Sequence, residues 1–189
     1  MQLAKIAGCF VIGVVGSSHK VEYVKSLGAD AVIAKSSQNL WKEIERIAPK
    51  GCDIILDANG YETLKKSYEH LSLGGKLVVY GFHSMFTKGR GKPNWFKLFW
   101  DYLLTPRFNP LFMTSENRSV LAFNLSYLMK KKKLLEEMVA IILKWVQEGK
   151  IAPPVIKSYA FEDVARAHSD LELGNTIGKL VLVTKHLYS

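Results

Sequence analysis

Apolar residues in the N-terminal part of the chain follow two patterns, short unbroken runs and stretches with the three-to-four-residue spacing of a helix. Residues 9–15 form an almost continuous apolar run rich in β-branched side chains, which is typical of a strand buried on both faces of a parallel sheet. Ser17 or Ser18 can cap the helix that follows, and Gly28 is placed to end it. The chain therefore starts an alternation of strand and helix.

The same alternation repeats further along. Strands are expected at 31–34, 53–57 and 76–81, and helices at 1–8, 39–48 and 61–71. This order implies right-handed crossovers and an α/β fold, with a Rossmann-like parallel sheet that carries helices on both faces. The first predicted element is the end of a helix, with no strand before it.

Composition favours one globular core. The 189 residues are 48% hydrophobic, enough to bury one sizeable core. No apolar run reaches the length of a membrane span, and the N-terminus lacks the pattern of a signal peptide. The two cysteines, Cys9 and Cys52, then indicate a reduced cytoplasmic protein, and by themselves they supply neither a structural nor a catalytic zinc site.

The net charge of +9 raises the question of an anionic partner. Its densest part is residues 130–133, four lysines before an amphipathic helix expected at 134–148. A solvated surface run is the favoured interpretation, and contact with phosphate or an anionic membrane stays open. No aromatic residue is interleaved with the lysines to stack on bases, so nucleic acid is not an expected partner.

Residues 95–113 are unusually rich in aromatic side chains. Four interpretations fit this density: a helix packed on the sheet, an interfacial membrane helix, a dimer surface, or the roof of an apolar substrate pocket. Pro106 and Pro110 end regular helix, so a helix followed by an irregular loop is expected.

Candidate chemistry lies in the loops after the strands, because open α/β sheets bind ligands beyond the carboxyl ends of their strands. After the first predicted strand the chain offers Ser17 and Lys20 and no acidic residue that could bind the ribose hydroxyls of NAD. A hydroxyl and a mobile ammonium fit a phosphate monoester. A capping serine and a surface lysine would have the same sequence.

Several blocks resemble the medium-chain dehydrogenase/reductase superfamily, within it the zinc-independent quinone oxidoreductases, and most closely the VAT-1 clade. The blocks are residues 2–5, 15–20, 27–29, 49–54, 75–81, 117–120, 161–164 and 178–182. Each block is ordinary by itself, and the resemblance lies in their order and spacing.

This resemblance implies an NADPH-dependent reductase of a quinone or enone, in which hydride passes from the nicotinamide to the substrate. It also implies a set of cofactor-binding residues: Ser17 and Lys20 at the adenosine phosphate, Asn59, Gly60, Gly81 and Phe82 along the crevice, Phe123 near the nicotinamide, and Asn175 with Lys179 in a closing turn. No residue is assigned as proton donor, because a strand-end tyrosine such as Tyr80 usually packs and a loop histidine such as His83 is usually solvated. The resemblance leaves a homodimer open.

The chain also departs from that family. The glycine-rich phosphate-binding turn and the β-rich catalytic lobe would lie before Met1. In the strand order 3-2-1-4-5-6 the absent strand is the central one, between the strands predicted at 9–15 and 53–57. Those two edges could close onto each other, recruit a strand from another chain, or leave the chain poorly folded.

We therefore expect an incomplete dinucleotide-binding domain at residues 1–150 and a return segment at 151–189, whose strands normally join the catalytic lobe. The isolated chain is expected to be inactive or weak and to bind NADPH poorly. The alternative function is a non-enzymatic protein that uses its basic and aromatic surfaces for partner or membrane contact, cytoplasmic and peripheral to a membrane.

Overall fold

The computed structural model describes residues 1–82, 95–174 and 176–184. Two compact units can be separated, one of Met1–Gln38 with Glu137–Ser189 and one of Asn39–Glu136. The predicted domain boundary at residue 150 stays a prediction.

The first unit opens with helix α1 (Gln2–Ile6), strand β1 (Ile12–Val15), the 3-10 turn η1 (Ser18–Lys20), helix α2 (Val21–Ser26) and strand β2 (Ala31–Ala34). β1 and β2 pair in parallel, from Ile12 opposite Ala31 to Val15 opposite Ala34. α2 packs on β2 and supplies the crossover between the strands.

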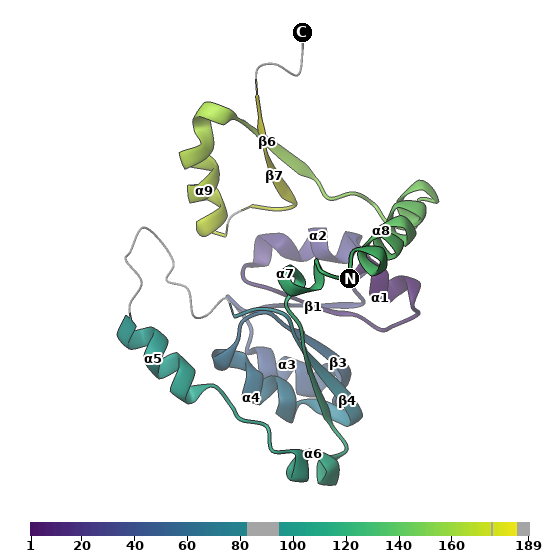
Figure 1. Ribbon diagram of the computed structural model, residues 1–189, viewed down its shortest axis with the longest axis vertical. Coiled ribbons are helices and arrows are strands. Elements are labelled where there is room, and N and C mark those ends of the chain that lie inside the picture. Colours follow the sequence, from purple (N-terminus) through teal and green to yellow (C-terminus); the bar gives the residue numbers. More distant parts are fainter. Residues whose placement is uncertain (83–94, 175, 185–189) are drawn as a thin grey trace. The chain divides into compact units, whose positions relative to one another are not determined.

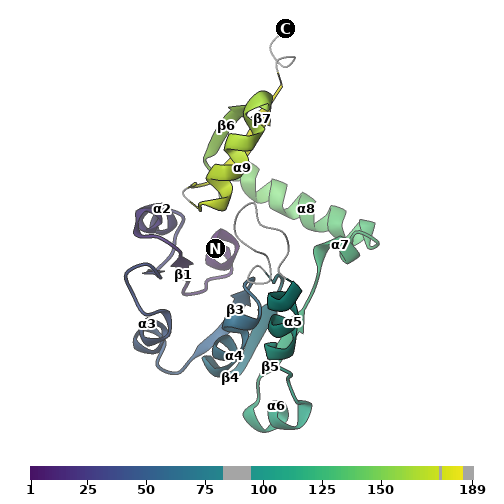
Figure 2. The ribbon, with the colours of Figure 1, turned by 90° about the vertical axis from the view of Figure 1, so that its left-hand side faces the viewer.

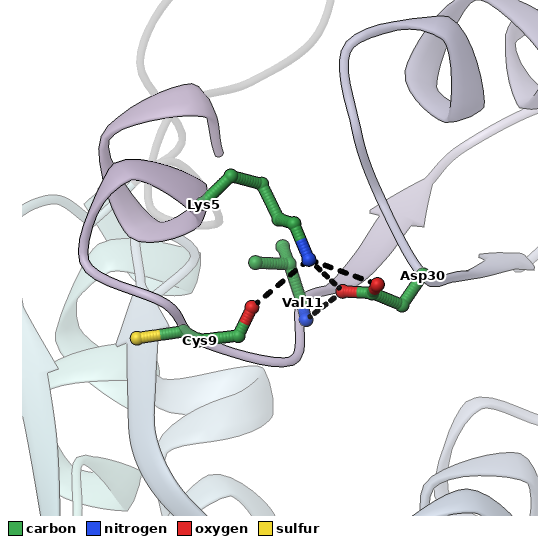
Figure 3. Close-up of polar contacts among 4 residues, drawn as sticks. All are labelled: Lys5, Cys9, Val11 and Asp30. Carbon is green, nitrogen blue, oxygen red and sulfur yellow. Dashed lines mark hydrogen bonds and ion pairs between the residues drawn. The ribbon is translucent and has the colours of Figure 1, made fainter.

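Hydrogen bonds to Asp30 explain why β1 starts later than the predicted residue 9. Figure 3 shows the Lys5 ammonium donating to both oxygens of Asp30, at 2.9 and 2.8 Å, and to the carbonyl of Cys9 at 3.1 Å. The amide of Val11 donates to the same carboxylate at 2.7 Å. The hydrogen bonds from Lys5 and Val11 lower the pKa of Asp30 below its usual value of 3.8. The residues before Ile12 thus tie α1 to the start of β2.

The C-terminal part of this unit contains most of helix α8 (Lys132–Gln147), then strand β6 (Ile156–Ala160), the 3-10 turn η3 (Phe161–Asp163), helix α9 (Val164–Glu172) and strand β7 (Lys179–Val183). β6 and β7 form a separate parallel pair, and α9 packs on both strands (Figure 1). The hydroxyl of Tyr159 and the ammonium of Lys157 both donate to Asp170 of α9, at 2.5 and 2.9 Å. These bonds attach the helix to the strand pair.

The second unit has the order α3 (Leu40–Ile47), β3 (Cys52–Asp57), α4 (Tyr61–Glu69), β4 (Leu71–Val79), α5 (Trp95–Leu104), α6 (Pro110–Glu116), β5 (Ser119–Ala122) and α7 (Leu125–Leu128). Its sheet is β3-β4-β5, entirely parallel. α4 lies against β3 and β4, as Figure 2 shows, over a core of Leu64, Leu71, Leu77 and Val79. On the opposite face the side chains of Ile54, Leu56 and Leu121 stay exposed.

β4 is longer than predicted at its start. The sequence placed helix up to residue 71 and strand from residue 76, with Gly74 and Gly75 as the break between them. Instead α4 ends at Glu69, and the strand runs through both glycines, with a register shift against β3 between Cys52 and Ile54. The glycines thus accommodate an irregularity inside a strand, because Gly74 has φ +80° and Gly75 lies against the backbone of its neighbours.

The predicted α/β class with parallel strands and helical crossovers is confirmed. The expectation that residues 9–15 and 53–57 share one sheet is wrong, because β1 pairs with β2, β3 pairs with β4, and the two pairs belong to different sheets. The strands β1 and β3 therefore do not pair directly with each other. The physical reason follows from the strand order: these strands are not neighbours in a 3-2-1-4-5-6 sheet, where a central strand separates them.

Candidate cofactor site at the carboxyl end of the β3-β4-β5 sheet

Three parallel strands end side by side in the second unit. The ladder continues one residue past each strand: the amide of Tyr80 donates to the carbonyl of Asp57 at 3.0 Å, and the amide of Phe123 donates to that of Val79 at 3.1 Å. The segments after the strands therefore meet at one edge of the sheet. This is the edge at which open α/β sheets bind ligands.

A cavity of about 400 Å³ lies at this edge. Its lining consists of Val79, Tyr80, Gly81, Phe82, Ala122, Phe123 and Asn124. The rings of Tyr80 and Phe123 stack with their centroids 6.4 Å apart, and both are about half exposed. Three residues predicted from the sequence, Gly81, Phe82 and Phe123, thus come together around one mainly apolar space.

Gly60 joins this group through Phe82. It has φ +95° and ψ −142°, a conformation available essentially to glycine, and it is buried. A Cβ atom at Gly60 would lie 2.7 Å from Cδ1 of Phe82. Glycine is therefore required here for the turn and for the close approach of the aromatic ring. Asn59, the residue before it, is half-buried in the same turn.

Asp57 holds that turn, and the sequence analysis did not identify it. Its buried carboxylate accepts hydrogen bonds from the amides of Asn59 and Gly60, at 2.8 and 3.2 Å, and from the hydroxyls of Thr63 and Ser67, at 2.7 and 2.8 Å. The available signal was an acidic residue ending an apolar strand, followed by Asn-Gly and a threonine near the start of a helix.

Ser17 and Lys20 belong to the first unit. Ser17 occupies the N-cap position of η1 in an extended conformation, yet its side chain makes no capping hydrogen bond, so the capping role considered from the sequence is not realised. Next to it the Ser18 hydroxyl lies 3.3 Å from that of Ser36 and 3.4 Å from that of Ser37. Hydroxyl groups therefore gather just after β1 and β2, with Lys20 at the end of η1.

The remaining predicted residues are at the C-terminal end. Lys179 is the first residue of β7, its side chain is exposed, and its amide donates to the carbonyl of Val155 at 2.8 Å. Asn175 lies outside the described residues, as does His83. The structure thus groups Asn59, Gly60, Gly81, Phe82 and Phe123 in the second unit, and it places Ser17, Lys20 and Lys179 in the first.

Comparison with known proteins decides the family. The profile of the zinc-binding dehydrogenase family matches residues 27–182, which is most of the chain. The chain belongs to the zinc-binding dehydrogenase family. The predicted membership of the medium-chain dehydrogenase/reductase superfamily, as a VAT-1-like protein, is confirmed.

Curated relatives align with almost the whole chain. The synaptic vesicle membrane protein VAT-1 homolog of Danio rerio is 29% identical over 184 residues, 97% of this chain and 38% of its own length. The NADP-dependent oxidoreductase RED1 of Cochliobolus heterostrophus is 28% identical over 187 residues, 96% of this chain and 49% of its own. The chain therefore spans about half the length, or less, of these relatives.

The fold has a solved counterpart. The quinone oxidoreductase of Pseudomonas syringae pv. tomato superposes with a TM-score of 0.75 at 24% identity, covering 96% of this chain and 51% of the other. At that identity the likeness establishes the fold alone. It supports the parallel α/β architecture described above.

The zinc in the family name can be tested on the donor atoms. Cys9 is exposed and Cys52 is half-buried, and these are the two cysteines of the chain. Within residues 1–82, 95–174 and 176–184, no three His, Cys, Asp or Glu side chains lie together in a way that could hold a metal ion. Structural zinc sites need four such ligands and catalytic sites three. The described residues do not fit zinc.

Membrane contact was the other open question. Across the described part of the chain, no helix combines the length and the apolar composition needed to cross a bilayer. The cytoplasmic location stays a prediction.

Proposed function

We propose that this chain is the nicotinamide-binding part of an NADPH-dependent oxidoreductase that reduces a quinone or an enone. The observation that supports this most is the apolar cavity at the carboxyl end of β3-β4-β5, where Gly81, Phe82 and Phe123 converge. The names of the relatives, an NADP-dependent oxidoreductase and a quinone oxidoreductase, point to the same reaction class.

The cavity suits a flat, uncharged ring. When bound, the dihydronicotinamide supplies a hydride to the substrate. Phe82, Phe123 and Tyr80 offer aromatic faces that hold such a ring by stacking and exclude water from one side of it. A Cβ atom at Gly81 would lie 3.0 Å from the carbonyl oxygen of Ala58, so glycine lets the segments after β3 and β4 come close together at this edge. The substrate would take its proton from a group that none of the described contacts identifies.

The second part of the proposal concerns the phosphate that distinguishes NADPH from NADH. The Ser17 hydroxyl makes no capping bond, so it is available to donate, and Lys20 supplies positive charge nearby in sequence. A hydroxyl and an ammonium around a phosphate monoester form charge-assisted hydrogen bonds. By family position, Asn175 and Lys179 would belong to a turn that closes over the cofactor.

Ligand titration tests both parts. Backbone amide signals of Gly60, Gly81 and Phe123 should shift when NADPH is added to the chain, and Lys20→Met should weaken the response about tenfold for NADPH while leaving NADH unaffected. Lys25→Met is the matched control, because Lys25 lies on the adjoining helix and pairs with Glu22. We expect binding weaker than micromolar. Absence of any shift at saturating NADPH would reject the proposal.

A second candidate function rests on helix α5, which exposes large aromatic side chains and buries a charged one. Trp95 and Phe96 are 77% and 78% exposed, whereas Asp101 is only 2% exposed. The Lys97 ammonium donates to Asp101 at 2.7 Å, and this bond raises the pKa of Lys97. Loss of solvent contact raises the pKa of Tyr61 on the neighbouring α4, and the charge of Asp101 adds to that effect. The charged side chains of α5 thus face α4, and its large aromatics face solvent.

Such a helix suits the interface of a membrane, where Trp, Phe and Tyr insert at the level of the headgroups. Sedimentation with anionic liposomes tests this. The double variant Trp95→Ser, Phe96→Ser should lose binding, while Phe10→Ser, at an aromatic residue of the first unit that is 67% exposed, should keep it. Binding that disappears in high salt for the unmodified chain would instead assign the contact to the lysines at 130–133.

A further inference from the structure

Asp57 is a charged group in an unusual place. Its side chain is 3% exposed at the end of β3, between the sheet and α4. Four donors surround it: one oxygen takes both backbone amides of the following turn, and the other takes the hydroxyls of Thr63 and Ser67. Burying a carboxylate costs free energy unless its oxygens are hydrogen-bonded. The four donors around Asp57 offset that cost.

The two amides connect Asp57 to the turn. With Asn59 and Gly60 both donating to one carboxylate oxygen, the chain has little freedom between the strand and the helix. The carbonyl of Gly60 then accepts from the amides of Thr63 and Leu64, each at 3.0 Å, and starts α4. The conformation of Gly60, with φ +95°, is therefore held from both sides.

Gly60 in turn connects to the cavity. The nearest neighbours of the absent Cβ are atoms of Phe82, at 2.7 Å for the ring and 3.2 Å for the Cα. Phe82 lines the cavity, and Asp57 does not. The position of the ring thus depends on where Gly60 lies, and the position of Gly60 depends on the Asp57 carboxylate.

We propose that Asp57 is a positioning residue for the cofactor cavity: through the amides of Asn59 and Gly60 it sets the place of the Phe82 ring. Its importance for NADPH rests on the proposed function above, whereas its effect on the turn and on Phe82 does not. The Ser67 hydroxyl satisfies the second oxygen, whereas Thr63 satisfies that oxygen and also contacts the Gly60 carbonyl, through its amide at 3.0 Å and its hydroxyl at 3.4 Å.

Three variants separate these effects. Asp57→Ala removes the acceptor, so the amides of Asn59 and Gly60 should exchange with deuterium about fivefold to tenfold faster, and the ring proton shifts of Phe82 should change. Asp57→Asn retains an oxygen acceptor and should restore both readouts to near wild-type values. Ser67→Ala should leave them unchanged, because its hydroxyl meets only the other oxygen.

Asp53→Ala is the matched control. Asp53 lies on the same strand, is exposed, and accepts a hydrogen bond from Ser72 at 2.7 Å, away from the turn. The proposal is overturned if Asp57→Ala and Asp53→Ala give the same exchange rates and the same Phe82 shifts. If Asp57→Ala does not fold, the other two variants test the assignment. Faster amide exchange in the turn of Ser67→Ala, together with wild-type exchange in Asp57→Asn, would contradict it.

The NADPH response is measured independently of amide exchange and the Phe82 ring shifts. If the unmodified chain responds to NADPH, Asp57→Ala should weaken that response about tenfold, while Asp53→Ala should leave it intact. If the unmodified chain does not respond, the proposed function fails, and the exchange and ring-shift measurements still decide whether Asp57 positions Phe82.

Discussion

Replacing Gly60 by alanine tests how tightly the turn beside the cavity is packed. The new Cβ would lie 2.7 Å from Cδ1 of Phe82, closer than real Cβ contacts occur, and 3.2 Å from its Cα, which is tighter than most of them. Holding alanine at φ +95° and ψ −142° costs about 1–3 kcal/mol. Displacing the packed ring and backbone adds about 1–3 kcal/mol more.

The free energy of unfolding should therefore fall by about 2–6 kcal/mol, the sum of the backbone and packing costs. Urea unfolding followed by tryptophan fluorescence measures this loss. Gly74→Ala is the matched control, because Gly74 also has positive φ, +80°, but no heavy atom lies within 4 Å of its Cβ position. It should lose only the backbone part, about 1–2 kcal/mol.

The difference between the two variants isolates the contact with Phe82. In a Phe82→Ala background the cost of Gly60→Ala should shrink, since the ring atom at 2.7 Å is gone, yet it should not vanish, because the Cα at 3.2 Å remains. Equal losses for Gly60→Ala and Gly74→Ala, or no coupling with Phe82→Ala, would refute the packing argument.

Three further outcomes are expected. Leu77→Ala, at a fully buried core position, should lower the free energy of unfolding by about 2–5 kcal/mol in the same urea assay. Because the pKa of Asp30 is lowered in the folded state, its contribution to the free energy of unfolding is complete above pH 3.8 and is lost as the pH falls through the lowered value. In Asp30→Asn the urea midpoint should therefore depend less on pH in the acid range. Tyr159→Phe should raise the pKa of Asp170 towards normal in a carboxyl NMR titration, since the hydrogen bond from Tyr159 is the main cause of its depression and Lys157 a lesser one; an unchanged pKa would contradict this.

Much of the fold can be predicted from the sequence because it depends on local patterns. The apolar runs and the helical spacings place β1, β2 and β3 within a few residues, and Gly28 and Gly60 mark turns that do have positive φ. The crevice residues after β4 and β5 were implied by the family resemblance, and they come together because parallel strands end at one edge of the sheet. These features need no knowledge of what the side chains touch.

The sequence by itself thus determined the α/β class, the family, and the cluster of Gly81, Phe82 and Phe123. Tertiary structure decided the pairing of β6 with β7, the inward-facing Lys97 and Asp101 of α5, and the four hydrogen bonds to Asp57. The physical reason is that spacing along a chain records which residues share a face. Whether a carboxylate on that face is buried and satisfied depends on donors that only packing brings together.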